Sequence, residues 1–350
     1  MKKSLLTALV LSVINVFLPV IVYVNNNNRD LSINNEPIGD VKDDTPEEEN
    51  KAENEFDKTL TFKVKIGDEI VQMSMNEYLP GVLAAEMPAS FPLDALKAQA
   101  VAARSFILYR LAHPVSDGVH DGVALCSNPA HCKGYTDISD STAARELYGA
   151  AADIYAAKLK KAAEETDGEV MTYENEPILA AFHAISGGRT ENASDVWEED
   201  LAYLRSVESP GEETAEKYET VVEYDASEYR ERLEKLAGTA LGDDAQNYIK
   251  DVERSDAGGV IRAKVGENVV KGSEIRMALG LNSADFTMEF RENSVVIRVR
   301  GYGHGVGMSQ YGARAMAADG ADYREILTHY YQGAELAVLD KNSIENVPAL

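Results

Sequence analysis

The sequence predicts an α+β protein, with a single mixed domain of helices packed with short antiparallel strands behind an N-terminal transmembrane helix. Three observations lead to this prediction. Residues 5–24 form an apolar stretch, residues 76–112 carry apolar side chains at helical spacing, and residues 60–75 and 286–300 alternate like strands. The helical and strand-like segments do not alternate regularly, as the βαβ units of a parallel sheet would require.

The composition limits the classes of function. With 350 residues, the chain is long enough for one large domain or two ordinary ones with a buried core. Its 34 basic and 59 acidic residues give a formal net charge of -25. Because nucleic-acid binding needs a cationic face, this balance argues against a nucleic-acid partner. It argues equally against a basic patch that docks on anionic lipid.

The N-terminus predicts a membrane anchor. Lys2 and Lys3 precede the apolar stretch 5–24, which has about the length that crosses a bilayer core. Positive flanking charge favours a cytoplasmic N-terminus. Residues 25–28 are all asparagine, where a cleavage site would need small residues, so we expect an uncleaved single-pass anchor. A cleaved signal peptide or a buried helix are the alternatives, and the first of these also places the rest of the chain outside the cytosol.

The remaining chain divides into a linker and a folded part. Residues 25–58 are rich in Asn, Asp and Glu and are predicted to be a disordered linker. The extracytoplasmic domain is predicted to span residues 59–340 and to begin with a hairpin that turns at Gly67 and Asp68. The later predictions are helices at 76–87, 92–112 and 141–165, a loop at 113–135, strands at 169–173, 177–184 and 286–300, a charged region up to about 257, and helices from Met308 onward.

Glu86 interrupts the apolar face of the first predicted helix. Asn76 is the expected N-cap, and Leu79, Val82 and Leu83 recur at helical spacing, with Glu86 at the next position of that stripe. A carboxylate on an apolar face loses solvation, and this raises its pKa. A glutamate that stays protonated near neutral pH is what a general acid must be. The alternative is that Glu86 turns to solvent or pairs with an arginine at the helix end.

The second predicted helix carries two long cations. Lys97 and Arg104 are about two helical turns apart, hence on roughly one face, among alanines that let another element approach closely. They are either partners of a functional site or ordinary surface cations.

A short loop contains His120, Cys126, His131 and Cys132 as H-x5-C-x4-H-C. Two thiolates and two imidazoles suit a tetrahedral zinc ion, and a full shell of protein ligands would make that zinc structural. The alternatives are a disulfide between Cys126 and Cys132, or two cysteines with neither metal nor disulfide.

Two glycine-bearing loops hold the other polar candidates. His183 and Ser186 follow an apolar strand, yet the G-x-S-x-G signature of serine hydrolases is absent. His304 lies in a segment with glycine at every second position from 301 to 307, which fits neither a dinucleotide nor a phosphate loop. This spacing predicts backbone that passes close to a ligand or to another strand, and Ser309 is a predicted helix cap. Incidental polar residues in turns are the alternative.

Several long motifs stand in this chain in a fixed order: NEYLPGVLAAEMP (76–88), ALKAQAVAARSF (95–106), FHAISGGRTENASDVW (182–197), YLRSV (203–207) and GYGHGVGMSQYGARAMA (301–317). Together they resemble the stage II sporulation protein D family, which is shared with amidase enhancers. The resemblance covers roughly residues 60 to 335. The anchor and the H-x5-C-x4-H-C loop resemble the sporulation branch, in which some members hold zinc in this loop.

The resemblance implies a membrane-anchored lytic transglycosylase that acts on peptidoglycan during engulfment of the forespore. It would cut the bond between N-acetylmuramic acid and N-acetylglucosamine, leave a 1,6-anhydro end, and prefer glycan already stripped of stem peptides. The implied partners are glycan strands, a peptidoglycan amidase or endopeptidase, and a membrane scaffold of the engulfment complex. The implied location is the mother-cell membrane, with the catalytic domain facing the space between the membranes.

The resemblance also implies roles for individual residues. Glu86 would be the catalytic acid, and because the sugar's C6 hydroxyl is the nucleophile, no second carboxylate is required. The other implied catalytic residues are Lys97, Arg104, His183, Ser186 and His304. The expected substrate contacts are Gln99, Gly187, Gly188, Tyr302, Gln310 and Tyr311. Zinc would be structural, and the chemistry would need no cofactor. Ile185 departs from the motif, where a small polar residue is expected.

Two other classes of function stay open at this point. One is a non-catalytic wall-binding protein that stimulates an amidase, as the enhancers of the same family do. The other is a zinc amidase that uses the His/Cys loop.

Overall fold

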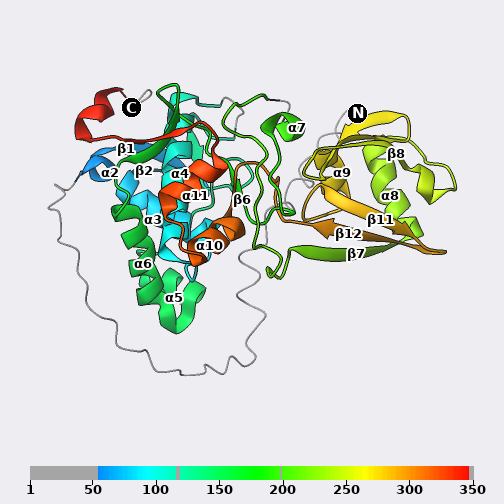
Figure 1. The fold of residues 1–350 in the computed structure, drawn as a ribbon, viewed down its shortest axis with the longest axis horizontal. Helices are drawn as coiled ribbons and strands as arrows, with labels where there is room; N and C mark the ends of the chain where they lie inside the picture. The colour runs from blue at the N-terminus through cyan, green and yellow to red at the C-terminus, as the bar shows by residue number, and fades with distance from the viewer. Residues whose placement is uncertain (1–53, 116–118, 198, 347–350) are drawn as a thin grey trace, which may run out of the picture.

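The computed structural model describes residues 54–115, 119–197 and 199–346, and its mixture of helices and strands confirms the α+β class. Figure 1 shows a larger lobe and a smaller lobe, the smaller one built from residues 219–300. The predicted anchor at 5–24 and most of the predicted linker lie outside the described residues. Within the described ranges, none of the helices combines the length and the apolarity needed to cross a bilayer.

The larger lobe is organised around one long helix. Its helices are α2 (Phe56–Thr59), α3 (Met75–Glu86), α4 (Leu93–Ala112), α5 (Ser141–Tyr148), α6 (Ala152–Glu164), α7 (Ala193–Trp197), α10 (Gln310–Ala318) and α11 (Tyr323–Tyr330). Its strands are β1 (Thr61–Ile66), β2 (Glu69–Ser74), β3 (Leu125–Cys126), β4 (Glu169–Tyr173), β5 (Glu176–Pro177), β6 (Phe182–His183), β13 (Met308–Ser309) and β14 (Glu335–Val338). The helix α4 lies at the centre, since it contacts α3, α6, α10, α11 and β4 and buries most of its side chains.

The first elements match the sequence-based expectations closely. The predicted hairpin is confirmed, because β1 and β2 pair antiparallel on either side of Gly67 and Asp68. The helix α3 begins at Met75, one residue earlier than expected, since Ser74 rather than Asn76 is the N-cap. Ser74 forms a capping box with Glu77, whose carboxylate accepts the Ser74 N–H at 2.9 Å.

Two predicted elements are wrong. The single helix expected at 141–165 is two helices, α5 and α6, joined by a 3-10 turn at Gly149–Ala151. Gly149 adopts a φ of 58°, which ends α5, because a residue with that backbone cannot continue a right-handed helix. Of the strand expected at 177–184, only Pro177, in β5, and the short β6 are in strands, and β6 pairs with β13 in parallel.

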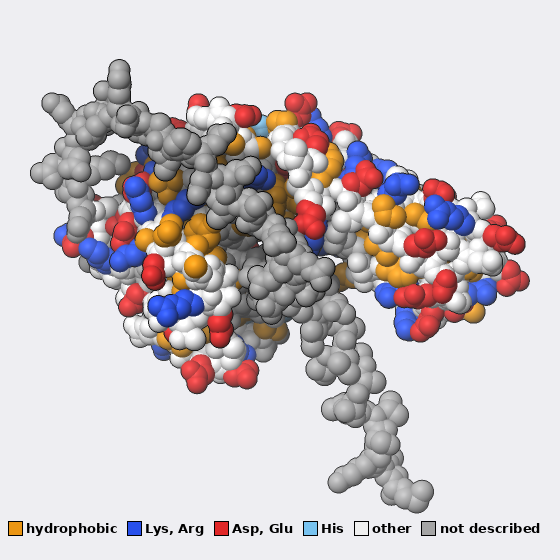
Figure 2. Space-filling model, turned by 90° about the horizontal axis from the view of Figure 1, so that it is seen from below, with side chains coloured by type: hydrophobic (Ala, Val, Ile, Leu, Met, Phe, Trp, Pro, Cys, Tyr) orange, Lys and Arg blue, Asp and Glu red, His pale blue; other side chains and the backbone are white. Residues whose placement is uncertain are grey.

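The smaller lobe has a hydrophobic core of its own. Its elements are β7 (Glu219–Asp225), α8 (Ala226–Ala237), β8 (Ile249–Arg254), β9 (Val260–Val265), β10 (Asn268–Lys271), α9 (Gly272–Ala278), β11 (Asp285–Phe290) and β12 (Ser294–Arg300). They form two antiparallel sheets, ordered β10-β9-β8 and β11-β12-β7, around buried Tyr229, Leu233 and Ile297. Acidic and basic side chains are interspersed over this lobe on the face in Figure 2. The described chain therefore has two cores, and the boundaries 59–340 of the predicted domain stay a prediction.

A buried ion pair ties the start of the described chain to the central helix. The guanidinium of Arg104, on α4, lies 2.6 Å from the carboxylate of Asp57, on α2, and both side chains are almost fully buried. Arg104 also donates to the backbone carbonyls of Glu169 and Ala163, at 2.9 and 3.2 Å. Phe56 beside it is fully buried. Residues 54–58, predicted as the end of the linker, therefore belong to the folded part.

We expect Arg104→Leu to lower the free energy of unfolding by about 3–5 kcal/mol, because it leaves the Asp57 carboxylate buried without its counter-ion. Urea unfolding followed by circular dichroism would measure this. Arg145→Leu, at an exposed position of α5, is the matched control. Adding Asp57→Asn to Arg104→Leu should restore part of the loss. A loss below about 1 kcal/mol for Arg104→Leu would show that the pair is not a structural tie.

Candidate functional site

Glu86 is the last residue of α3 and is partly buried. Its carboxylate accepts a hydrogen bond from the backbone N–H of Gly134, with 2.5 Å between the nitrogen and Oε1. Burial raises the pKa of Glu86, while the positive charge of Lys133 and the bond from Gly134 oppose the rise. The upward direction agrees with the prediction for a carboxylate on an apolar stripe, whose other members, Leu79, Val82 and Leu83, are fully buried.

The cation whose charge lowers the pKa of Glu86 is Lys133, which the sequence analysis did not identify. Its side chain is 9% exposed, and its Nζ lies 3.5 Å from the ring centre of Phe182 and 4.3 Å from that of Phe106. Burial lowers the pKa of Lys133 to about 8. A lone lysine in a loop carries no periodic signal, and its aromatic neighbours come from distant segments, so only the fold reveals it.

Lys97 and Arg104 share a face of α4, as predicted, but that face packs against the end of α6 and the start of β4. The Nζ of Lys97 lies 2.5 Å from the carboxylate of Glu165. Arg104 is 0% exposed and bonded to Asp57, so it has a structural role in the larger lobe, and its predicted catalytic role stays a prediction.

Gln99 and Gln310 hold the end of α3 in place. The side-chain amide of Gln310 donates to the backbone carbonyl of Glu86 at 2.9 Å and to the Gln99 side chain at 3.2 Å. Gln99 is 0% exposed and Gln310 is 6% exposed. These hydrogen bonds position the end of α3, and the substrate contacts expected for the two side chains stay a prediction.

The glycine-rich segment packs directly on the strand that carries His183. The glycines at 301, 303, 305 and 307 all have positive φ. A Cβ at Gly303 would lie 2.8 Å from the Cβ of His183, and one at Gly307 would overlap the carbonyl oxygen of Ala181. The expectation of a close approach to another strand is thus confirmed. Ser309 caps α10 as predicted, accepting the N–H of Gly312 at 3.2 Å.

This packing brings the two predicted histidines together. The ring centres of His183 and His304 are 5.7 Å apart, and that of Trp197 is 5.1 Å from His304. Burial lowers the pKa of His183 to about 4. Burial, then the charges of His183 and Lys133, lowers the pKa of His304 well below its usual value. Both imidazoles are therefore neutral near pH 7, and His183 follows Phe182, on whose ring the Nζ of Lys133 packs.

Ser186 belongs to a buried network around Glu212. Its N–H and Oγ donate to the Glu212 carboxylate at 2.6 and 3.1 Å, and Ser209, which also bonds Tyr330, donates to the same carboxylate. Ser186 is 2% exposed. These bonds hold the loop that carries Ser186, and the catalytic role expected for Ser186 stays a prediction. Glu212, in the charged region of the sequence, gave no signal of a buried role.

The other predicted substrate contacts lie around these loops. Gly187 lines a pocket between the lobes, and the N–H of Gly188 donates to the Oγ of Ser186 at 3.1 Å. Tyr302 is partly exposed, and its backbone pairs with Ile185 in an antiparallel bridge. Ile185 is 3% exposed, so the apolar residue at this unexpected position packs inward. Tyr311 is partly exposed and packs edge-on against Phe91.

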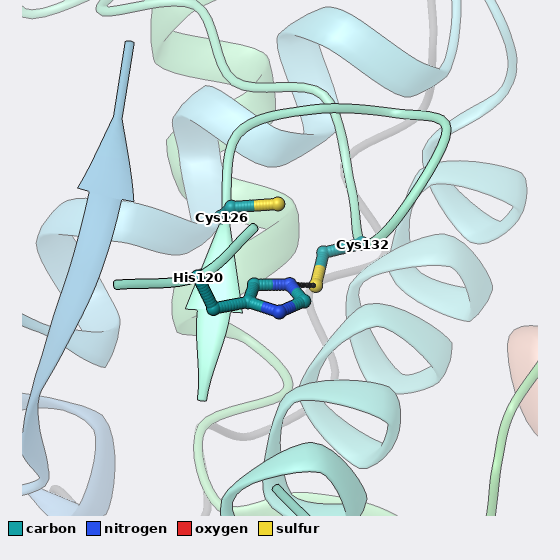
Figure 3. A group of neighbouring side chains, drawn as sticks. All are labelled: His120, Cys126 and Cys132. Atoms are coloured by element: carbon teal, nitrogen blue, oxygen red, sulfur yellow. Dashed lines mark hydrogen bonds between the residues drawn. The ribbon is translucent and has the colours of Figure 1, made fainter. Parts of the chain in front are cut away.

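Three of the four predicted metal ligands cluster (Figure 3). The ligand atoms of His120, Cys126 and Cys132 lie within 4.8 Å of one another, and all three residues are buried. Hydrogen bonding from Cys126, opposed by burial and aided by His120, lowers the pKa of the Cys132 thiol to about 5. The two cysteines are not joined in a disulfide. His131 does not belong to this group of described residues, and its ring centre is 6.0 Å from that of His120.

Glu212→Gln should change how stability depends on pH. Burial raises the pKa of Glu212 from its usual 4.5 to about 7, so between these pH values the folded protein binds more protons than the unfolded chain. Stability contributed by Glu212 therefore falls as pH rises through this window, by up to about 3 kcal/mol. The difference in unfolding free energy between the parent and Glu212→Gln should shrink over that range in urea titrations. Glu213→Gln, at the exposed neighbouring position, should show no such trend, and a pH-independent difference for Glu212→Gln would contradict the assignment.

Comparisons with known proteins agree with this arrangement. The family model described as Stage II sporulation protein matches residues 65–173, which include Glu86 and the His/Cys loop. The chain is 36% identical to Stage II sporulation protein D of Bacillus subtilis (strain 168), over 77% of this chain and 76% of that protein. It is equally similar, at 36% over the same shares, to Stage II sporulation protein D of Bacillus amyloliquefaciens. The Amidase enhancer of Bacillus subtilis (strain 168) is 28% identical over 74% of this chain, but only 40% of that protein is covered.

Both full-length relatives named Stage II sporulation protein D match across three quarters of their length, and the family model covers the helix that ends at Glu86. The chain belongs to the stage II sporulation protein D family.

Proposed function

We propose that this protein is a lytic transglycosylase that cleaves peptidoglycan glycan strands, with Glu86 as its one catalytic carboxylate. The observation that carries this proposal is the position of Glu86, whose pKa is raised by burial at the end of a rigid helix. A carboxylic acid of that kind can donate a proton to the bridging oxygen of a glycosidic bond near neutral pH.

The proposed reaction uses Glu86 twice, first as the acid and then as the base. Glu86 gives its proton to the bridging oxygen as the bond to C1 breaks, and the resulting carboxylate takes the proton of the C6 hydroxyl as that oxygen attacks C1. The atoms balance without added water, and the product end is a 1,6-anhydro sugar. Hydrolytic glycosidases use a second carboxylate instead. Here the charged side chain that acts on Glu86 is Lys133, a cation, which supports the single-carboxylate route.

Lys133 and the imidazoles have roles that follow from their charge states. With a pKa of about 8, Lys133 is mainly cationic at pH 7 and stabilises the Glu86 carboxylate once the proton has left. His304 is neutral, so it can orient sugar hydroxyls by hydrogen bonding without adding charge. Trp197, next to His304, offers a flat apolar surface of the kind on which sugar rings stack.

The proposed setting is the sporulating cell. Membership of a sporulation family supports action during endospore formation, and the predicted anchor at 5–24 would hold the enzyme on the outer face of the mother-cell membrane. The proposed substrate is glycan stripped of stem peptides, so the proposed partners are an amidase or endopeptidase that removes those peptides and a membrane scaffold that holds the enzymes together. The amidase enhancer among the relatives supports this link to an amidase.

Glu86→Gln should abolish anhydro-ended fragments from peptide-free glycan, because an amide cannot donate the proton. Purified protein would be incubated with denuded strands, and the products identified by mass spectrometry. Glu69→Gln, an exposed carboxylate on β2, should leave the product yield unchanged. If the parent protein released no anhydro ends, or if Glu86→Gln released as many as the parent, the proposal would fail.

A second candidate function is stimulation of an amidase without glycan cleavage, favoured by the 28% identity to an Amidase enhancer. This function predicts that amidase activity rises equally with the parent protein and with Glu86→Gln, and that neither produces anhydro ends.

We also propose that a structural zinc ion is held by His120, Cys126 and Cys132, with His131 from the same loop as the fourth ligand. The residues present fit this metal, since zinc prefers thiolate and imidazole ligands, and the pKa of about 5 at Cys132 already favours a thiolate. The ion would cross-link the loop that carries Lys133 and Gly134, the two groups that set the environment of Glu86. The site would thus act on catalysis only through the position of that loop.

Metal analysis should find about one zinc per chain, and a chelator should lower the melting temperature by roughly 5–10 °C. Cys126→Ser and Cys132→Ser should both lose the metal. His131→Ala is the matched comparison and should weaken zinc binding less than either cysteine variant, because it removes a neutral imidazole rather than a thiolate. A metal-free protein whose cysteines titrate as a disulfide would contradict the zinc proposal.

A further inference from the structure

A pocket lies between the two lobes and contains an arginine that has no acidic partner. The pocket is bounded by the loop after β6, by α9 and by the glycine-rich segment that carries His304. Two of its three arginines are neutralised: Arg189 pairs with Glu208 at 3.4 Å, and Arg300 pairs with Asp285 at 3.0 Å. Arg276 forms no ion pair within the described residues, and its Nε donates only to the backbone carbonyl of Leu281, at 3.2 Å.

None of the acidic groups that line the same pocket forms an ion pair with Arg276 within the described residues. The carboxylate of Glu191 accepts the N–H of Gly259 at 3.1 Å, and that of Asp195 accepts the side-chain amide of Asn192 at 2.8 Å. Asp285 is bonded to Arg300. In a chain with a net charge of -25, a partly buried guanidinium without a carboxylate is therefore a specific feature of this pocket. Its terminal nitrogens retain donors for a planar anion.

The position of Arg276 is fixed by close packing. It projects from α9, whose first residue is Gly272, and a Cβ at Gly272 would overlap the carbonyl of Val260. The helix therefore sits directly on β9, without room for adjustment. Burial lowers the pKa of Arg276, as expected for a cation held away from bulk water without a counter-ion.

Arg276 also lies next to the proposed catalytic centre. Arg276 and His304 line the same pocket, and the ring centre of His304 is 5.7 Å from that of His183. On the other side of His183, the Nζ of Lys133 lies 3.5 Å from the ring centre of the neighbouring Phe182, and Gly134, which follows Lys133, donates to the Glu86 carboxylate. A continuous path of interacting groups thus leads from Glu86, through Lys133 and His304, to Arg276. A glycan cut at Glu86 would place a neighbouring sugar at this pocket.

We propose, resting on the glycan-cleaving function above, that Arg276 binds the lactyl carboxylate that N-acetylmuramic acid exposes once its stem peptide has been removed. While the peptide is attached, that carbonyl is a neutral amide followed by a bulky chain, and it offers the guanidinium no negative charge. After removal it is a carboxylate, whose two oxygens match the guanidinium fork. Arg276 is therefore a specificity residue that distinguishes peptide-free glycan from intact peptidoglycan.

The test measures binding rather than cleavage, with the full chain carrying Glu86→Gln so that the ligand stays intact. The probe is the tetrasaccharide of alternating N-acetylglucosamine and N-acetylmuramic acid, either with free lactyl carboxylates or with those carboxylates converted to methylamides. Calorimetry should show that the conversion weakens binding about tenfold when Arg276 is present. Arg276→Gln should bind both forms with the weaker affinity, and Arg276→Lys should restore part of the difference.

A control variant distinguishes a direct contact between Arg276 and the ligand from a general effect of the protein's positive charge. Arg298→Gln removes an exposed arginine of β12 in the same lobe and should keep the tenfold preference. Equal binding of the two tetrasaccharides to the Arg276 protein, or an unchanged preference in Arg276→Gln, would overturn the proposal. So would tight binding of a tetrasaccharide that still carries stem peptides, because the carboxylate recognised would then be that of the peptide.

A failure of the proposed glycan-cleaving function would give a different result from a failure of the Arg276 proposal. In that case the parent protein would release no anhydro ends, whereas the preference for the free carboxylate is measured on a variant that cannot cleave.

Discussion

The hydrogen bond from the N–H of Gly134 to the Glu86 carboxylate joins the end of a buried helix to a loop, and the rest of the site depends on it. The contact is close, since a Cβ at Gly134 would lie 3.0 Å from that of Ala85. Gln310 and Gln99 fix the helix from one side. The His/Cys cluster and the packing of Lys133 on aromatic rings fix the loop from the other. The resulting environment removes water from the carboxylate and places one positive charge beside it, which is how a fold prepares a group to give up a proton and then take one back.

A second constraint connects this centre with the smaller lobe. The glycine-rich segment follows β12 directly and lies close to the strand of His183, since a Cβ at Gly301 or Gly307 would collide with backbone and a Cβ at Gly303 would collide with the Cβ of His183. One short stretch therefore positions His304, carries one wall of the pocket that contains Arg276, and ends at β13 and the cap of α10. Because of this shared element, the orientation of the smaller lobe and the geometry around Glu86 are not independent of each other. In the proposed reaction, substrate selection and proton transfer would thus depend on the same few residues.

The sequence predicted the features that depend on local pattern. The hairpin at 60–75, the two helices up to residue 112 and the position of Glu86 on an apolar stripe follow from periodicity, which is set by neighbours in the chain. Features that depend on distant contacts were missed or misjudged. The ion pair of Arg104 was missed because its partner, Asp57, lies in what was taken for a linker. Lys133 and Glu212 lie in a loop and in a charged stretch, and only tertiary packing buries them. The smaller lobe was missed because its strands and helices alternate charged and apolar residues over short lengths.

The protonation of Glu86 is the most direct test of the account. The carboxyl carbon of Glu86 can be followed by carbon-13 NMR over a pH titration, with Glu86→Gln identifying its signal. The account predicts a midpoint clearly above the usual 4.5, because burial outweighs the opposing effects of Lys133 and Gly134. A midpoint at or below 4.5 would show that Glu86 is a stabilised carboxylate, unable to serve as the acid.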